Sequence, residues 1–331
     1  MAFPSLSLLL LLLPFLSLLP PTHSKLSPDY YNKTCPSFHS IMEKVVFDKQ
    51  AAAPTTAAGT LRVFFHDCMV EGCDASILVA SNAFNKAERD EEINLSLPGD
   101  AFEIVTRAKT ALELECPGIV SCSDILATAT RDLIVMVGGP HYEVRLGRKD
   151  SLVAFSSNVN GHLATPEMSM DEIISLFAAN GFSIQEMVAL MGAHTIGFSH
   201  CSQFADRLFN FSKTTETDPV FDPDFARALK KLCGNYTKNP QIAAFNDVIT
   251  PGKFDNMYFK NLRRGLGLLK QDHDIFVDTR TKPFVDLYAA DQKAFFDAFA
   301  HAMEKVSVYK VKTGKKGEVR RRCDQFNNIN A

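Results

Sequence analysis

Apolar side chains recur at helical intervals in several segments of this chain. Between 98 and 112, apolar residues follow one another every three or four positions, which places them on one face of a helix. The segments 55–68, 121–137 and 291–308 have a similar character. No set of segments alternates apolar and polar residues as half-buried strands do. The pattern predicts a mainly α protein with little β structure, and short strands are expected only near 142–146.

Three further helices are predicted from their first residues. Ser-x-x-Glu occurs at 169–172 and again at 183–186. In such a capping box the serine side chain accepts a backbone amide hydrogen, while the glutamate accepts the amide hydrogen of the serine. Gly181 and Gly192 follow at a suitable distance and are expected to end these two helices. Asp222-Pro223 predicts the third start, because aspartate caps a helix and proline fits its first turn.

The first 24 residues differ from the rest in composition. They contain no Lys, Arg, Asp or Glu, and ten of the first 20 are leucine. The longest uninterrupted apolar run, Leu8–Leu13, is much shorter than the roughly 20 residues of a membrane span. Such a run fits the core of a signal peptide, and Thr22 and Ser24 suit cleavage before Lys25. We therefore expect 1–24 to be a secretory signal peptide and 25–331 to be secreted, without a membrane anchor.

Composition and charge narrow the class of protein. The chain has 331 residues, of which 46% are apolar and 22% are charged. These values are typical of globular proteins and exclude a disordered or collagen-like chain. Lys and Arg number 35 and Asp and Glu number 38, so the formal net charge is −3. A chain this close to neutral lacks the basic surface typical of nucleic-acid-binding proteins, and no such partner is expected.

All eight cysteines follow the predicted signal peptide. In an oxidising compartment an even number of cysteines favours disulfides over thiolate metal sites. Eight cysteines allow many pairings, and their spacing alone does not select one. Glycosylation sequons at Asn32, Asn210 and Asn235 agree with export, and a fourth sequon begins at Asn94.

Two histidines are candidates for chemistry. Arg62 and His66 are four residues apart near the end of the predicted helix 55–68, so they share one face. A permanent cation beside a titratable imidazole is unfavourable unless a polar or negative group lies between them, but a simple surface pair explains the spacing equally well. His194 lies in Gly-Ala-His-Thr-Ile-Gly, where small neighbours let a flat ligand approach. For a single histidine of this kind, a buried core residue is the usual explanation.

Two short segments are rich in oxygen donors. The first runs from Asp67 to Ser76 and contains Cys68 and Cys73, which could close it as a small ring. The second lies within 247–255. Carboxylate, hydroxyl and carbonyl oxygens suit Ca²⁺, although the spacing is not that of an EF-hand. A polar turn with a small disulfide is the alternative for the first segment.

Together these motifs resemble those of the secretory plant haem peroxidases (class III). Residues 62–68 (Arg-Val-Phe-Phe-His-Asp-Cys) and 72–76 (Gly-Cys-Asp-Ala-Ser) are similar to the distal signature of the family, and 192–197 is similar to its proximal signature. Further matches, in the order of the family, lie at 26–31, 146–151 and 250–256. The resemblance implies that 25–331 is one haem peroxidase domain. The implied fold is mainly α with ten or more helices, and the haem lies between an N-terminal distal half and a C-terminal proximal half.

The resemblance implies roles for five side chains. His194 would be the axial ligand of the haem iron, and Asp272 would accept its other N–H as a second-shell group. His66 would accept a proton from the peroxide and return it, oriented by Asn94. Arg62 would stabilise the charge that develops in the transition state. Because a buried Asn94 with this role is not free to carry a glycan, its sequon is expected to stay unmodified.

The resemblance also implies two calcium ions and four disulfides. The residues of the first calcium site would be Asp67, Val70, Gly72, Asp74, Ser76 and, through water, Glu88. Those of the second would be Thr195, Asp247, Thr250, Lys253 through its carbonyl, and Asp255. The implied disulfides are Cys35–Cys116, Cys68–Cys73, Cys122–Cys323 and Cys201–Cys233.

The implied activity is the reduction of H₂O₂, followed by oxidation of small phenolic donors in one-electron steps. One haem b and two Ca²⁺ are expected, in a monomer of the extracellular space or cell wall. The implied processes are hydrogen peroxide catabolism, the response to oxidative stress, and the metabolism of lignin or wall phenolics. Two alternatives are a calcium-stabilised wall-binding protein without turnover, and a metal phosphohydrolase that uses His66 and Asp67.

Some positions depart from the family pattern. Ala164-Thr165-Pro166 stands where many members have Pro-x-Pro, and the carbonyl of Ala164 is the candidate contact for an aromatic donor. Met69 stands where phenylalanine is common, and Tyr142 where the family usually has its tryptophan. Lys25 replaces a common cyclising glutamine. Because none of these positions carries the peroxide chemistry, the donor preference is less well defined by the sequence than the reaction.

Overall fold

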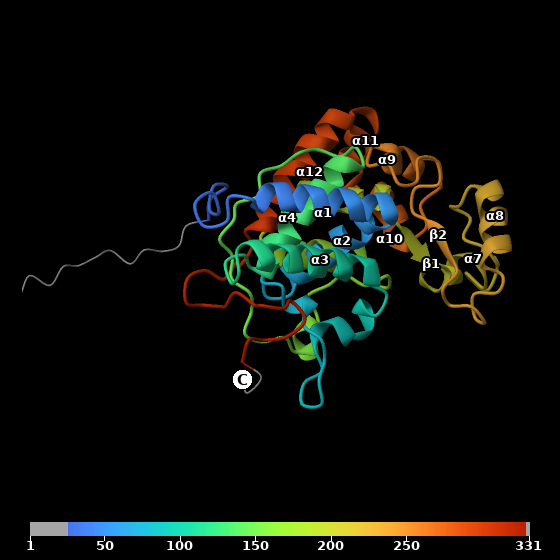
Figure 1. Ribbon diagram of the computed structural model, residues 1–331. Coiled ribbons are helices and arrows are strands. Elements are labelled where there is room, and N and C mark those ends of the chain that lie inside the picture. Colours follow the sequence, from blue (N-terminus) through green and yellow to red (C-terminus); the bar gives the residue numbers. More distant parts are fainter. Residues whose placement is uncertain (1–25, 329–331) are drawn as a thin grey trace, which may run out of the picture.

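The computed structural model describes residues 26–328, so the expected signal peptide lies outside the described residues. Within this range the chain forms twelve α-helices and one two-stranded sheet (Figure 1). The prediction of a mainly α fold with ten or more helices is confirmed. The helices are α1 (Phe38–Ala52), α2 (Thr56–Met69), α3 (Gly99–Glu115), α4 (Cys122–Met136), α5 (Met170–Ala179), α6 (Ile184–Met191), α7 (Ala205–Leu208), α8 (Pro223–Cys233), α9 (Met257–Leu262), α10 (Lys270–Val277), α11 (Lys282–Ala290) and α12 (Gln292–Ser307). The strands are β1 (Phe198–His200) and β2 (Ala243–Phe245).

Helices α1 to α4 form one packed group, which lies in the centre of Figure 1. α1 contacts α3 and α4, and α2 contacts the same two helices. Almost every residue of α2 is buried, because this helix is covered on several sides. Its remaining residues are Ala58, Arg62 and Phe65, which keep partial exposure. Their spacing of four and three residues places them on one face, so α2 has a single accessible stripe.

Aromatic rings fill the space between α6, α9, α11 and α12. Phe254 stacks on Phe295 with ring centroids 5.7 Å apart, and Phe259 meets Phe295 edge-on at 5.0 Å. Each buried ring contributes roughly 1.5–3 kcal/mol, which gives the many phenylalanines of this chain a structural use. Gly192 is required beside this cluster, because a Cβ there would lie 2.4 Å from the ring of Phe295. The cluster therefore fixes the chain two residues before His194.

A smaller group of α7, α8, β1 and β2 lies at one side of the molecule (Figure 1). The two strands pair antiparallel, with Phe198 opposite Phe245. The prediction of short strands near 142–146 is wrong. Only Leu146 pairs there, in an isolated bridge with Ser27. The remaining residues of that segment have no neighbouring strand to receive their backbone hydrogen bonds, although Tyr142 is buried.

The helix starts predicted from caps are confirmed. Both capping boxes form, at the beginning of α5 and of α6. Asp222 accepts the backbone amide hydrogens of Asp224 and Phe225 at the start of α8. α5 ends just before Gly181, whose φ of +83° is favourable for glycine. α6 ends at Met191 with Gly192 as its C-cap, as expected, and the chain then continues as a 3₁₀ helix over Gly192–Thr195 that carries His194.

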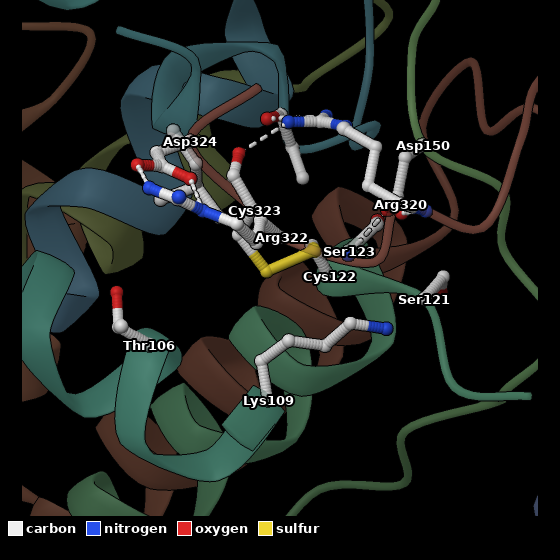
Figure 2. Close-up of a disulfide and its surroundings, with 12 residues drawn as sticks. Thr106, Lys109, Ser121, Cys122, Ser123, Asp150, Arg320, Arg322, Cys323 and Asp324 are labelled. Carbon is white, nitrogen blue, oxygen red and sulfur yellow. Dashed lines mark hydrogen bonds and ion pairs between the residues drawn. A yellow bond between two sulfur atoms is a disulfide. The ribbon is translucent and has the colours of Figure 1, made fainter. Parts of the chain in front are cut away.

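The four disulfides join Cys35–Cys116, Cys68–Cys73, Cys122–Cys323 and Cys201–Cys233, the same pairs that the resemblance implies. Cys122 is the first residue of α4, and its bond to Cys323 spans 201 residues (Figure 2). Arg320 strengthens this connection, since its backbone amide donates to Asp150 and its side chain donates to the carbonyl of Cys323. The C-terminal segment is thereby held against the N-terminal half.

Among residues 26–328, no single helix is long and apolar enough to cross a bilayer. α5 and the helical stretch from Ile184 to Thr195 meet the length and composition criteria only as a pair, and that pair is bent by 109°.

Candidate active site

The accessible stripe of α2 carries the first part of the site. Nε of Arg62 lies 3.3 Å from Nε2 of His66, one helical turn further on. The guanidinium nitrogen can only donate, so Nε2 of His66 is the acceptor and carries no proton. Because the imidazole is neutral, it accepts a hydrogen bond from the cation directly. No negative group is needed between the two side chains.

Asn94 settles which nitrogen of His66 carries the hydrogen. Nδ2 of Asn94 donates to the backbone carbonyl of Glu88 at 2.7 Å, which leaves Oδ1 to face His66. Oδ1 lies 2.6 Å from Nδ1 of His66, and the imidazole must donate this hydrogen bond. Asn94 is only 2% exposed. Both ends of the amide are therefore occupied within the protein, and the lone pair of His66 is on Nε2.

Burial is the main cause that lowers the pKa of His66 to about 3, and the positive charge of Arg62 acts in the same direction. The hydrogen bond with Asn94 opposes both effects. Arg62 itself is held by the carbonyl of Ile93 at 3.1 Å and by the hydroxyl of Ser96 at 2.9 Å. Its pKa is lowered by burial to about 10, so it remains a cation at neutral pH. The pair therefore combines a neutral base with a fixed positive charge.

The second part of the site is built around His194, on the 3₁₀ helix after α6. Nδ1 of His194 lies 2.9 Å from Oδ1 of Asp272, in α10. Because the carboxylate accepts, Nδ1 carries a hydrogen, and in the neutral imidazole this leaves the lone pair on Nε2. The side chain of His194 is 35% exposed, whereas Asp272 is buried. An imidazole oriented from behind, with a free and accessible Nε2, is the arrangement that an axial metal ligand needs.

The loop after His194 meets α2. A Cβ on Gly197 would lie 3.1 Å from the Cβ of Ala58, so the two backbones approach closely. Ala58 belongs to the same accessible stripe as Arg62. The fold thus makes His194 and the stripe of α2 parts of adjoining surfaces, although His66 and His194 are far apart in the sequence. A flat cofactor that needs a histidine ligand and a polar distal face fits these residues.

Asp272 has two further partners that the sequence did not indicate. The hydroxyl of Tyr258 donates to Oδ1 at 2.8 Å, and the backbone amide of Leu269 donates to Oδ2 at 2.8 Å. Burial raises the pKa of Asp272, but the hydrogen bond and charge of His194, with those two donors, outweigh it and lower the pKa overall. The pKa of Tyr258 is raised well above its usual value, chiefly by burial and by the charge of Asp272. Tyr258 therefore keeps its proton.

A cluster of oxygen donors follows His66 directly in the chain. Asp67, Asp74 and Glu88 are each 1% exposed. The hydroxyl of Ser76 donates to Glu88 at 2.8 Å, and the backbone amide of Asp74 donates to Asp67 at 3.1 Å. The other two residues expected in this set, Val70 and Gly72, are buried in the same loop.

These buried carboxylates repel one another. Burial raises the pKa of Glu88 to about 9, and the charges of Asp67 and Asp74 add to the increase. The pKa of Asp67 is also raised, first by burial and then by Asp74. Such a cluster is stabilised by a cation, and its oxygen donors fit Ca²⁺. Within residues 26–328, no three His, Cys, Asp or Glu side chains are placed to hold a metal ion by themselves, so hydroxyl and carbonyl oxygens would have to complete the set.

Lys312 already brings one positive charge to this cluster. Its ammonium group forms an ion pair with Oδ2 of Asp74. The two residues are 238 positions apart, and Lys312 belongs to a run of basic residues near the C-terminus that gives no indication of this contact.

The second cluster of oxygen donors adjoins His194. The hydroxyl of Thr250 lies 3.0 Å from Asp247 and 3.2 Å from Asp255. The hydroxyl of Thr195 lies 3.5 Å from the carbonyl of Lys253 and 3.4 Å from the backbone nitrogen of Asp255. All five expected residues therefore lie together, and the set consists of hard oxygen donors as Ca²⁺ requires.

Of the positions that depart from the family pattern, Lys25 lies outside the described residues, and the others differ in burial. Ala164 is exposed, and the next carbonyl, of Thr165, accepts a hydrogen bond from the side chain of Gln271. Gln271 precedes Asp272 in α10, so the segment without Pro-x-Pro is still attached to the element behind His194. Met69 and Tyr142 are buried.

Comparisons with known proteins agree with this geometry. A family model described as Peroxidase matches residues 42–291. Peroxidase 6 of Arabidopsis thaliana is 64% identical over 305 residues, which cover 92% of this chain and 93% of that protein. Peroxidase 65 and Peroxidase 41 of the same plant are 62% and 60% identical, each over 92% of this chain, and over 90% and 92% of their own length.

The chain therefore belongs to the peroxidase family, among the plant class III peroxidases. It is an enzyme that reduces H₂O₂ with electrons from a reducing substrate, and its family uses haem. The phosphohydrolase alternative finds no support in these relatives, all of which are named as peroxidases.

Proposed function

We propose that the chain is a secreted haem peroxidase that binds one haem b through Nε2 of His194 and oxidises phenolic donors in successive one-electron steps. The observation that carries this proposal is the hydrogen-bonded set Arg62–His66–Asn94, of which Arg62 lies on the accessible stripe of α2. The stripe adjoins the loop of His194 through the contact of Ala58 with Gly197. When bound, the haem would supply the two electrons that peroxide cleavage needs and would regain them one at a time from the donors.

His66 moves the proton. Its Nε2 lone pair accepts a proton from the near oxygen of H₂O₂ and then donates it to the far oxygen, which leaves as water. The low pKa of His66 favours the second half of this transfer, since a protonated imidazole with pKa about 3 is a strong acid. Asn94 keeps the ring in the tautomer that makes Nε2 the active nitrogen. His66 is thus both the general base and the general acid.

Arg62 contributes a fixed positive charge and does not transfer a proton. Its guanidinium is fixed by Ile93 and Ser96, so it needs no reorganisation when negative charge develops on the departing oxygen. The same charge disfavours protonation of His66 before peroxide arrives. Behind His194, Asp272 accepts the Nδ1 hydrogen and makes Nε2 a stronger electron donor.

Two Ca²⁺ ions are part of the proposal. Asp67, Val70, Gly72, Asp74, Ser76 and Glu88 hold the first, and Thr195, Asp247, Thr250, Lys253 and Asp255 hold the second. The first cluster is connected to His66, because Glu88 accepts from Ser76 through its side chain and from Asn94 through its carbonyl. The second is connected to His194 through the adjacent Thr195. Each ion thereby stabilises the position of one histidine.

The donors are small phenols, including lignin precursors and wall phenolics, that approach beside Ala164. The exposure of Ala164 and the attachment of its neighbour to α10 support this placement. The mature chain, 25–331, acts as a monomer outside the cell, with no membrane or nucleic-acid partner. Asn32, Asn210 and Asn235 are exposed and are the candidate glycosylation sites, whereas Asn94 stays unmodified because it is buried.

A stopped-flow absorption experiment tests the proposal. The purified protein, loaded with haem and calcium, is mixed with one equivalent of H₂O₂, and a phenol is added afterwards. We expect the Soret band to fall with peroxide and to recover with the phenol. A Soret band that does not respond would support the wall-binding alternative without turnover. A His194→Ala variant that still forms the same Soret band would contradict the assigned ligand.

A further inference from the structure

The carboxylate behind His194 is shared between two side chains. Oδ1 of Asp272 lies 2.9 Å from Nδ1 of His194 and 2.8 Å from the hydroxyl of Tyr258. Both groups donate to the same oxygen atom. The pairing of His194 with Asp272 has a role in the proposed function, but Tyr258 has none there.

We propose that Tyr258 is a positioning residue that sets, through Asp272, how strongly His194 donates electrons to the haem iron. This inference rests on the proposed role of His194 as the axial ligand. It concerns a residue that does not touch the iron, the peroxide or the donor.

The physical reason is competition for one acceptor. A hydrogen bond from the Tyr258 phenol stabilises negative charge on Oδ1 of Asp272, and an oxygen that is already stabilised attracts the His194 hydrogen less strongly. The hydrogen then stays closer to Nδ1, and the imidazole has less of the anionic character that stabilises ferric over ferrous iron. Tyr258 therefore limits the effect that Asp272 would have alone.

The carboxylate of Asp272 is held in this position by its other contacts. Oδ2 of Asp272 accepts the backbone amide hydrogen of Leu269 at 2.8 Å, so the group is held at both oxygens. α9, which carries Tyr258, contacts both α10 and the 3₁₀ helix of His194. The rings of Tyr258 and His194 meet edge-on, with centroids 5.8 Å apart. The three side chains come from three different elements and form a closed arrangement.

The surroundings strengthen each hydrogen bond. Tyr258 and Asp272 are both 1% exposed, and the ring of Phe259 packs edge-on against Tyr258. Hydrogen bonds are electrostatically stronger in such a low-dielectric interior. Among the described residues, no lysine or arginine forms an ion pair with Asp272, whose partner is the imidazole of His194. The charge of Asp272 is thus balanced by hydrogen bonds. The loss of one donor therefore strengthens the hydrogen bonds that the other donors make.

The test is the Tyr258→Phe variant of the haem-loaded enzyme, which removes the hydroxyl and keeps the ring. We expect the ferric/ferrous equilibrium to shift about tenfold toward the ferric form, which is about 59 mV for a one-electron couple. The iron–histidine stretching frequency in the ferrous protein should rise. Tyr288→Phe is the matched control, since Tyr288 is a buried tyrosine of the same aromatic cluster whose hydroxyl faces the carbonyl of Gln185.

Two further measurements keep the test independent of that one variant. Replacement of Tyr258 by a fluorotyrosine, whose phenol is a stronger donor, should move both readouts in the opposite direction. In an Asp272→Asn background, Tyr258→Phe should change the potential and the stretching frequency much less than it does in the native background. The reason is that the charged acceptor through which Tyr258 acts is gone.

The outcomes separate this inference from the proposed function. If the native protein shows an iron–histidine stretch but Tyr258→Phe leaves both potential and frequency unchanged, the inference is wrong and the proposed ligand stands. An equal shift in the Asp272→Asn background would also overturn it, because Tyr258 would then act by another route. If the native protein shows no iron–histidine stretch, the ligand assignment and the inference both fail.

Discussion

The Nε atom of Arg62, on the accessible stripe of α2, lies 3.3 Å from Nε2 of His66, which is buried one turn further along the helix. The hydrogen bond requires a neutral imidazole, and the pKa of that imidazole is lowered first by burial and then by the charge of Arg62. In the proposed function the two residues act as one unit, in which burial and the cation together keep the base unprotonated until peroxide supplies the proton.

Replacement of either residue should slow the reduction of H₂O₂ without loss of haem. We expect Arg62→Leu to reduce the second-order rate constant about 10²–10³-fold, the usual effect of removing one preorganised group. His66→Ala should cause a larger loss, because it removes the base and the acid together. Stopped-flow kinetics measure both effects, with the exposed His39→Ala as control. A normal rate in His66→Ala would refute the assignment.

The rate of peroxide reduction should depend on pH through His66. With a pKa of about 3, the imidazole is neutral and able to accept a proton at any higher pH, so the rate should fall only as the pH drops toward that value. Asn94→Asp places a negative charge beside Nδ1 and should raise the midpoint by about one unit or more. A pH-jump stopped-flow series checks this, with circular dichroism to confirm folding. An unchanged midpoint in Asn94→Asp would contradict the assignment.

Calcium should stabilise the protein more at high pH than at low pH. In the calcium-free protein the pKa of Glu88 is about 9, against 4.5 for an ordinary glutamate. Between these two pKa values, Glu88 is ionised in the unfolded chain but stays protonated in the folded protein. The calcium-free protein therefore loses stability as the pH rises. Ca²⁺ binds the ionised form and reverses this loss.

The measurement is the melting temperature of calcium-stripped and calcium-loaded protein at about pH 5 and about pH 8, on either side of the middle of that window. We expect the larger difference at the higher pH. Glu172→Gln, which changes an exposed glutamate of a helix cap, should not alter the pattern. Equal differences at both pH values would show that these carboxylates do not hold the ion.

Lys312 should limit the dependence on calcium. Lys312→Met removes the ion-pair partner of the buried Asp74. The calcium-free protein should lose up to about 3 kcal/mol of stability, while the calcium-loaded protein should change less. Denaturant unfolding with and without calcium measures the two values. Lys316→Met, in the same segment but exposed, is the control. A loss of equal size in both states would mean that Lys312 has no relation to the ion.

The disulfides should differ in their contribution to stability. Cys122–Cys323 closes a loop of 201 residues, and Cys68–Cys73 closes one of 5. In the entropic model, removal of the first bond costs about 5 kcal/mol and removal of the second about 2 kcal/mol. Paired Cys→Ala variants, compared by guanidinium unfolding, test this order. A larger loss from the short loop would show that it acts mainly by holding Asp67 and Asp74.

The helices illustrate what local sequence can predict. The capping boxes at Ser169 and Ser183 and the Asp222-Pro223 start all form, because a cap involves neighbours within one turn. Gly192 shows the limit of this reasoning. Its sequence context correctly predicts the end of α6, but it does not reveal the ring of Phe295, which lies 103 positions later in the chain and leaves no room for a Cβ.

For the active site, too, some features follow from local sequence and others only from the tertiary structure. The sequence by itself determined the residue types of the active site, the shared face of Arg62 and His66, and the resemblance that paired the cysteines, since motifs and helical spacing are local properties. Only the tertiary structure decided that Tyr258 shares Asp272 with His194, that Lys312 reaches Asp74, and that the sheet forms at Phe198–His200 rather than near 142–146. These contacts join segments that are separate in the chain, and they form because burial brings polar groups together that must then satisfy one another.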